Sequence, residues 1–152
     1  TAAEKLTTTT LTANVNQELS GAAVSAASVS INSLSLLSGG GVTLTNAFPN
    51  YPVLTIQSGG ILAMAGNNGI TGGVVLASAN SGTSVRPLYV HALGDLNINS
   101  VLLGVRGLVK AGAGTLTISQ PSMMGRDDDT NNNINFVNEG TLKLAGGTNT
   151  LF

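Results

Sequence analysis

The chain has 152 residues and a net charge of −1, with 42% apolar residues, only 9% charged residues and no cysteine. This balance excludes charge-driven disorder, and six Lys and Arg residues are too few for a nucleic-acid-binding patch. Without cysteine there is no disulfide, thiol nucleophile or thiolate metal site. Thr, Ser, Asn and Gly together supply 67 residues, which excludes a coiled coil or a helical bundle.

Residues 19–85 contain no charged residue, but Gly, Ser, Thr and Asn interrupt every apolar run in this segment. No run approaches the roughly 20 apolar residues that a transmembrane helix needs. We therefore expect a soluble chain without membrane insertion.

Short bursts of alternating apolar and polar residues recur along the chain and predict β-strands of three to five residues. Residues 7–12 open the chain with a strand-like run of threonines. Residues 20–31 leave helix and strand open, because four alanines are mixed with Ser and Val. The clearer strands are expected at 33–36, 42–45, 53–56, 88–90, 96–98, 115–118, 134–136 and 142–144.

Glycine, asparagine and serine clusters separate these strands, and two spacings recur between them. Residues 94–98 (GDLNI) align with 114–118 (GTLTI) at an offset of 20, and the latter align with 140–144 (GTLKL) at an offset of 26. Residues 38–42 (SGGGV) also align with 58–62 (SGGIL) at an offset of 20. A repeat near 20 residues, with room for insertions, is what one coil of a parallel β-helix requires.

The sequence therefore predicts an all-β fold, a right-handed parallel β-helix (β-solenoid) of about six or seven coils. It forms a single domain over 1–152, in which 1–31 has the least regular pattern. Leu, Ile and Val would stack inside the coils, and turn asparagines would stack as hydrogen-bonded ladders.

Residues 108–119 (LVKAGAGTLTIS), followed by 138–144 (NEGTLKL), resemble the autotransporter-associated β-strand repeat of large bacterial surface proteins. The resemblance covers 108–144. It implies a right-handed β-helix in a passenger domain exported by type V secretion. The matching structural positions are Gly112, Gly114, Thr115, Leu116, Gly140, Thr141 and Leu142. Two departures stand out, because residues 120–133 replace a short turn and no membrane barrel follows.

Few residues are candidates for chemistry. His91 and Asp95 would form a base and its orienting partner only if a turn at Gly94 folds the chain back, since four extended residues span about 13 Å. We favour an ordinary outward histidine. The stiff loop 48–52 would present Tyr51 to a sugar or a protein, or pack it over the end of a coil.

The only cluster of charges contains Asp127, Asp129 and Asn131, oxygen donors at alternate positions that suggest calcium. The calcium-loop pattern needs glycine at the sixth position and glutamate at the twelfth, where Asn132 and Asn138 stand. We therefore favour a solvated loop with no bound metal or cofactor. The remaining carboxylates lie far apart, so no catalytic residues are assigned and we do not expect an enzyme.

The expected function is a structural one, as a rod, stalk or adhesin-like segment that lies outside the cell or on a bacterial cell surface. One alternative is a fibre subunit that self-associates head-to-tail through its solenoid ends, where no capping helix is evident. A third possibility is a carbohydrate-binding or carbohydrate-active β-helix. The expected partners are copies of the chain, other parts of the same surface protein, or a host-surface or polysaccharide ligand.

Overall fold

The computed structural model describes residues 5–7, 9–45, 50–77, 86–124 and 135–147, which form strands and turns without any helix. No helix long and apolar enough to cross a membrane occurs in these ranges. The strands are β1 (Lys5–Thr7), β2 (Asn16–Leu19), β3 (Ala22–Ser25), β4 (Val29–Ile31), β5 (Ser33–Leu36), β6 (Gly41–Leu44), β7 (Val53–Ile56), β8 (Gly60–Ala63), β9 (Asn67–Ala77), β10 (Leu88–Ala92), β11 (Asp95–Val105), β12 (Leu108–Ala111), β13 (Thr115–Ile118), β14 (Met123–Met124), β15 (Phe136–Val137) and β16 (Thr141–Leu144).

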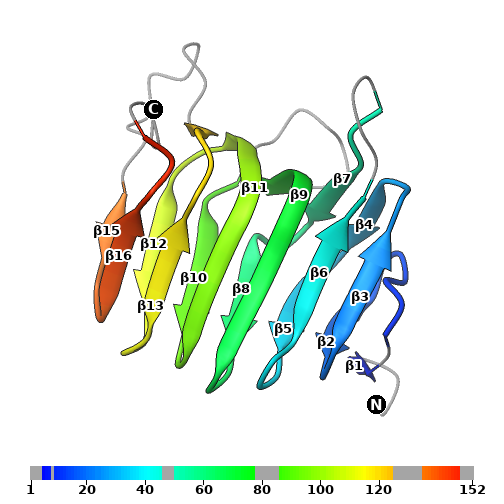
Figure 1. Cartoon of the computed structure of the whole chain (residues 1–152), viewed down its shortest axis with the longest axis horizontal. Coiled ribbons are helices and arrows are strands. Elements are labelled where there is room, and N and C mark those ends of the chain that lie inside the picture. Colours follow the sequence, from blue (N-terminus) through cyan, green and yellow to red (C-terminus); the bar gives the residue numbers. More distant parts are fainter. Residues whose placement is uncertain (1–4, 8, 46–49, 78–85, 125–134, 148–152) are drawn as a thin grey trace.

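Two sheets take alternate strands from the chain, and every strand pairing is parallel. The A sheet has the order β1-β2-β5-β8-β10-β12-β15, and the B sheet contains β3-β6-β9-β11-β13-β16. The near sheet runs upward and the far sheet downward as the coils advance from right to left, so the winding is right-handed (Figure 1). The predicted parallel β-helix is confirmed, with about six coils.

The B sheet bends to form a third row of strands. The first part of β9 pairs with β6 and its last part with β7, and Gly72 and Gly73, both with positive φ, lie between them. In β11 the register shifts between Asn99 and Val101 at the equivalent corner. A bulge of this kind turns a strand without ending it.

The core is a set of aliphatic columns that run along the solenoid axis. One column stacks Ala23, Val42, Ile70, Ile98, Ile118 and Leu144. Another stacks Leu34, Ile61 and Val90 from the A sheet. All these residues except Leu144 are buried, and alternate residues of each strand point outward, as the period-2 pattern predicted.

The predicted repeat offsets have a mixed outcome. Leu96 pairs with Leu116 and Leu116 with Leu142, so the offsets of 20 and 26 are confirmed. The alignment of 38–42 with 58–62 is wrong. Gly41 instead lies beside Gly69 in the B sheet, and Gly60 begins an A-sheet strand. Each coil has several corners, and two different corners use a similar Ser-Gly-Gly turn.

The N-terminal region also differs in part from expectation. Residues 20–31 form the strands β3 and β4, so the strand alternative is the correct one. The strand-like run 7–12 does not continue through Thr9–Thr12, which lie outside any strand. This segment lies against the first coil: Leu11 packs on the core, and the Asn14 amide donates to Ser30 O.

Hydrogen-bonded side-chain ladders occur between coils, as predicted, but they mix residue types. The amide of Asn32 and the hydroxyl of Ser33 both donate to Asn16 Oδ1. The Gln120 amide donates to Asn99 Oδ1 at 2.8 Å. Amides and hydroxyls therefore satisfy one another along the corners of the solenoid.

Candidate functional site

The residues that match the repeat motif lie together at one corner, where β12 turns into β13 and the next coil enters β16. Gly112 and Gly140 have positive φ at this corner. The Gly114 amide donates to Ala92 O at 2.9 Å, and the Thr141 amide donates to Gly114 O at 3.3 Å. Thr115 and Thr141 begin their strands. Leu116 and Leu142 stack on each other in a second column of the B sheet, which also contains Leu96. The motif thus stacks one coil closely on the next.

Lys110 occupies the inward position of this corner and is fully buried. Its ammonium group donates to Gly112 O at 2.6 Å and to Ala111 O and Glu139 O at 3.0 Å each. Burial lowers the pKa of Lys110, and the charge of Glu139 opposes this shift. The backbone carbonyls of two successive coils therefore share one internal cation.

The sequence already contained a signal for this buried lysine. In the strand Leu108–Ala111, the period of two places Lys110 in phase with buried Leu108 rather than with the outward residues. A lysine in an inward phase needs an internal hydrogen-bond partner. Sequence reasoning did not draw that conclusion.

No hydrogen bond joins the described side chains of His91 and Asp95. His91 is exposed on the outer face of β10, and Asp95 begins β11 after the turn at Gly94. Asp95 Oδ1 accepts a hydrogen bond from the Thr115 amide at 3.0 Å, which links two coils. Asp95 therefore has a structural role.

The calcium candidates Asp127, Asp129 and Asn131 lie outside the described residues. Within the part of the chain that the structure describes, no group of three His, Asp or Glu side chains is placed to hold a metal ion.

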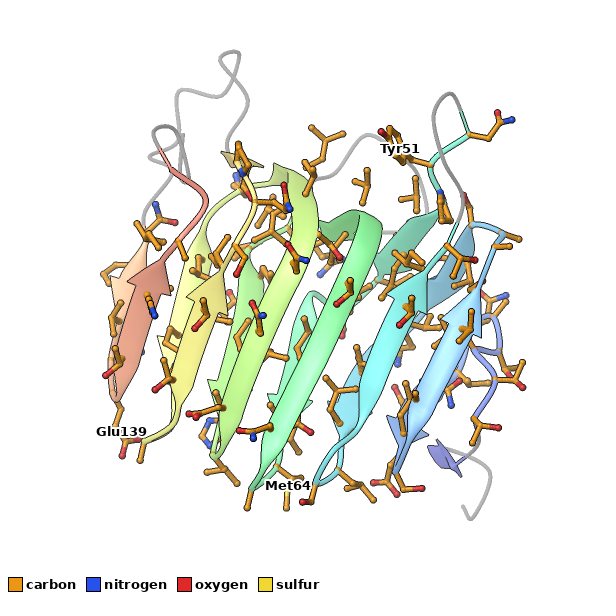
Figure 2. The ribbon with its side chains drawn as sticks, viewed as in Figure 1. Tyr51, Met64 and Glu139 are labelled. Carbon is orange, nitrogen blue, oxygen red and sulfur yellow. The ribbon has the colours of Figure 1, made fainter. Side chains whose placement is uncertain are left out.

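Tyr51 is half-exposed and lies at the edge of the solenoid opposite to Met64 and Glu139 (Figure 2). It borders a groove of about 260 Å³. Glycines and amides of the B-sheet corner complete the groove: Gly72, Gly73, Asn99, Ser100 and Gln120. Tyr51 thus stands over a corner of the coils, in the middle of the rod rather than at an end.

A depression lies on the outer face of the A sheet, and we call it the A-face groove. Its volume is about 400 Å³, and Tyr89 and His91 of β10 stand at its centre. The remainder of its outward surface comes from Ser33 and Ser35 of β5, Gly60 and Leu62 of β8, and Val109 and Ala111 of β12. Sequence reasoning did not find this groove, because it depends on which residue of the preceding coil lies beside Tyr89.

The two ends of the solenoid differ. At the N-terminal end, the amide of Thr12 donates to the buried Gln17 side chain at 3.0 Å, and the amide of Asn14 donates to Ser30 O at 2.8 Å. At the C-terminal end, no described strand pairs with the outer edge of β15 or β16. Val137 and Leu144, both in inward register, remain 49% and 48% exposed. Among the described strands, the outer edges of β1 and β3 lack a partner as well, so the ends differ in side-chain cover rather than in strand pairing.

Comparisons with known proteins add no relative, since no family model, no curated protein and no solved structure matches the chain.

Proposed function

We propose that the protein is a structural β-solenoid, a stiff rod or stalk segment of a bacterial surface or secreted protein, related to autotransporter passengers and without enzymatic activity. The motif at 108–144 supports the bacterial passenger assignment. The continuous parallel stacking of coils supports a load-bearing rod, because every coil is held by backbone hydrogen bonds and aliphatic columns.

The observation that carries this proposal is the apolar surface of the last described coil. The apolar side chains of Phe136, Val137 and Leu144 are half-exposed at that end, beside the outer edges of β15 and β16, which have no partner among the described strands. Unpaired strand edges with apolar neighbours recruit further strands. These features favour association of the last described coil with further β-structure.

The filament alternative requires both ends to be available. Leu11 and the hydrogen bonds of Thr12 and Asn14 hold a segment against the first coil. We propose that this segment opposes head-to-tail stacking there, although the outer edges of β1 and β3 have no partner among the described strands. Association through the last coil alone gives a closed pair rather than a filament.

The test is the mass of the purified chain by light scattering over a concentration series, with negative-stain microscopy of the same samples. We expect a concentration-dependent dimer of short rods, and Leu144→Glu should restore the monomer. Leu93→Glu is the matched control, because Leu93 is also 48% exposed but lies in a turn in the middle of the rod. A wild-type monomer at every concentration, or the same behaviour of both variants, would show that the last coil is not a stacking surface.

A further inference from the structure

The A-face groove is formed by outward residues of four neighbouring strands of the far sheet in Figure 1, β5, β8, β10 and β12. Neighbouring strands lie about 4.8 Å apart, so four strands extend the groove for about 14 Å along the solenoid axis. Tyr89 is 49% exposed, and His91 lies two residues further on the same face. Because both positions are in a paired strand, their spacing is fixed.

A glycine opens a shelf beside the tyrosine. Gly60 is the cross-strand partner of Tyr89. Its φ is not positive, and an added Cβ would meet only Ser58 Oγ, at 3.3 Å. The backbone therefore does not require glycine at this position. The missing side chain leaves space next to the tyrosine ring, and Ser33 of β5 continues the shelf with another small residue.

The lining of the groove contains no carboxylate, ammonium or guanidinium group. None of its lining residues is Asp, Glu, Lys or Arg. The depression on the B sheet, in contrast, contains both Asp95 and Lys143. An uncharged groove disfavours anionic ligands such as nucleic acids and acidic polysaccharides, because nothing compensates the cost of desolvating their charges.

The backbone of the groove is already satisfied. β5, β8, β10 and β12 each pair with a strand on both sides, so the groove has no free strand edge for an extended peptide. A ligand must be recognised by side chains alone. Those available are an aromatic ring, an imidazole, aliphatic surfaces, the hydroxyl of Ser35, and Ser33 Oγ as an acceptor, because the Ser33 hydroxyl already donates to Asn16 Oδ1.

We propose that the A-face groove binds a neutral glycan, whose chain runs along the solenoid axis across β5, β8, β10 and β12. A sugar ring presents an apolar C–H face and polar hydroxyls at its rim. The Tyr89 ring can stack on the C–H face of the sugar, while His91, Ser33 and Ser35 offer hydrogen bonds to its hydroxyls. The rod would then contact a glycan surface along its side, independently of the stacking at its last coil.

The experiment is a calorimetric titration of the full chain with three neutral hexasaccharides, cellohexaose, laminarihexaose and chitohexaose, and with the acidic hexagalacturonate. We expect at least one neutral probe to bind and hexagalacturonate not to bind. Tyr89→Ala and Gly60→Val should each weaken binding about tenfold or more, since the first removes the ring and the second fills the shelf.

Gly69→Val is the matched control. Gly69 is also an outward glycine without positive φ, but it lies in the B sheet, where an added Cβ would meet only Asn97 O at 3.8 Å. It should bind as the wild type does. The absence of binding to every neutral probe, equal binding of hexagalacturonate, or unchanged binding by folded Tyr89→Ala and Gly60→Val would each overturn the proposal. Leu144→Glu should leave glycan binding unchanged, so this result is independent of the rod-stacking test.

Discussion

The ammonium group of Lys110 holds two coils together from inside the solenoid. It donates to carbonyl oxygens of Ala111 and Gly112 in one coil and of Glu139 in the next. A buried carbonyl that loses its donor costs about 1–3 kcal/mol, so side chains that cannot donate should be poorly tolerated here.

We expect Lys110→Met to lower the free energy of unfolding by about 3 kcal/mol, because it fills the same space but leaves three carbonyls without their donor. Urea denaturation followed by circular dichroism measures the loss. Lys143→Met, at an exposed position of β16, is the control and should change stability by less than about 0.5 kcal/mol. Equal effects of the two substitutions would contradict an internal role for Lys110.

The same lysine should give a pH dependence with a defined sign. Burial lowers its folded-state pKa below the reference value of 10.5. At pH values between the lowered folded-state pKa and 10.5, the unfolded chain binds more protons than the folded chain. The contribution of Lys110 to the free energy of unfolding therefore rises with pH in this range. The stability difference between wild type and Lys110→Met should therefore widen as the pH is raised toward 10.5 in parallel urea titrations. A difference that narrows would show that the ammonium form is favoured by folding.

Gly140 should be irreplaceable for two separable reasons. Its φ is +74°, and an added Cβ would lie 2.5 Å from Gly114 O and 2.8 Å from Lys110 Nζ. Gly147 has a similar φ of +81° but nothing within 4 Å. We expect Gly147→Ala to cost about 1–2 kcal/mol for the left-handed backbone alone, and Gly140→Ala clearly more. Urea midpoints of the two variants test this, and equal losses would mean that coil contact contributes nothing.

At the scale of the strand, the unit of stability is the column rather than the single strand. Ile98 is fully buried between Ile70 and Ile118 of the neighbouring coils. A strand of four residues has little stability alone, and it persists because each inward side chain has one neighbour above and one below.

We expect Ile98→Ala to cost about 2–5 kcal/mol and Ile98→Val about 0.5–1.5 kcal/mol, in proportion to the volume removed from the column. Thr117→Ala, at an outward position of β13, is the control. Thermal and urea unfolding should show the largest loss of stability for Ile98→Ala, a smaller loss for Ile98→Val and the smallest for Thr117→Ala. Similar stabilities of Ile98→Ala and Thr117→Ala would argue against a packed column.

The strands with clear period-2 alternation, such as 33–36, 53–56 and 115–118, were predictable together with their inward phase, because this alternation reports burial directly. The strands β2, β8, β9 and β12 were not among those expected. The pairing of Leu96 with Leu116 and of Leu116 with Leu142 was predictable as well, since glycine and threonine mark the same corner in each coil. The pairing of Gly60 with Tyr89 was not predictable. Its offset differs from 20, and the segment between the two residues carries no repeat that would indicate the length of the coil.

At the scale of the whole molecule, we expect the difference between the two ends to determine how copies of the rod associate. The Gln17 side chain is buried in the first coil, in register with Leu34, and accepts the hydrogen bond from the Thr12 amide. It therefore anchors the segment that crosses the first coil. A polar anchor thus lies in the first coil, and half-exposed apolar side chains lie on the last described coil.

Replacing the anchor should make the first coil available and change the mode of assembly. Gln17→Leu keeps the buried volume but leaves the Thr12 amide without its acceptor, so we expect the covering segment to detach and copies to stack head-to-tail. Negative-stain microscopy should then show rods longer than a dimer, and adding Leu144→Glu should remove them. Gln120→Leu is the matched control, since Gln120 bonds Asn99 in the middle of the rod and should leave assembly unchanged. If Gln17→Leu gives the same particles as the wild type, the covering segment is not what prevents stacking at the N-terminal end.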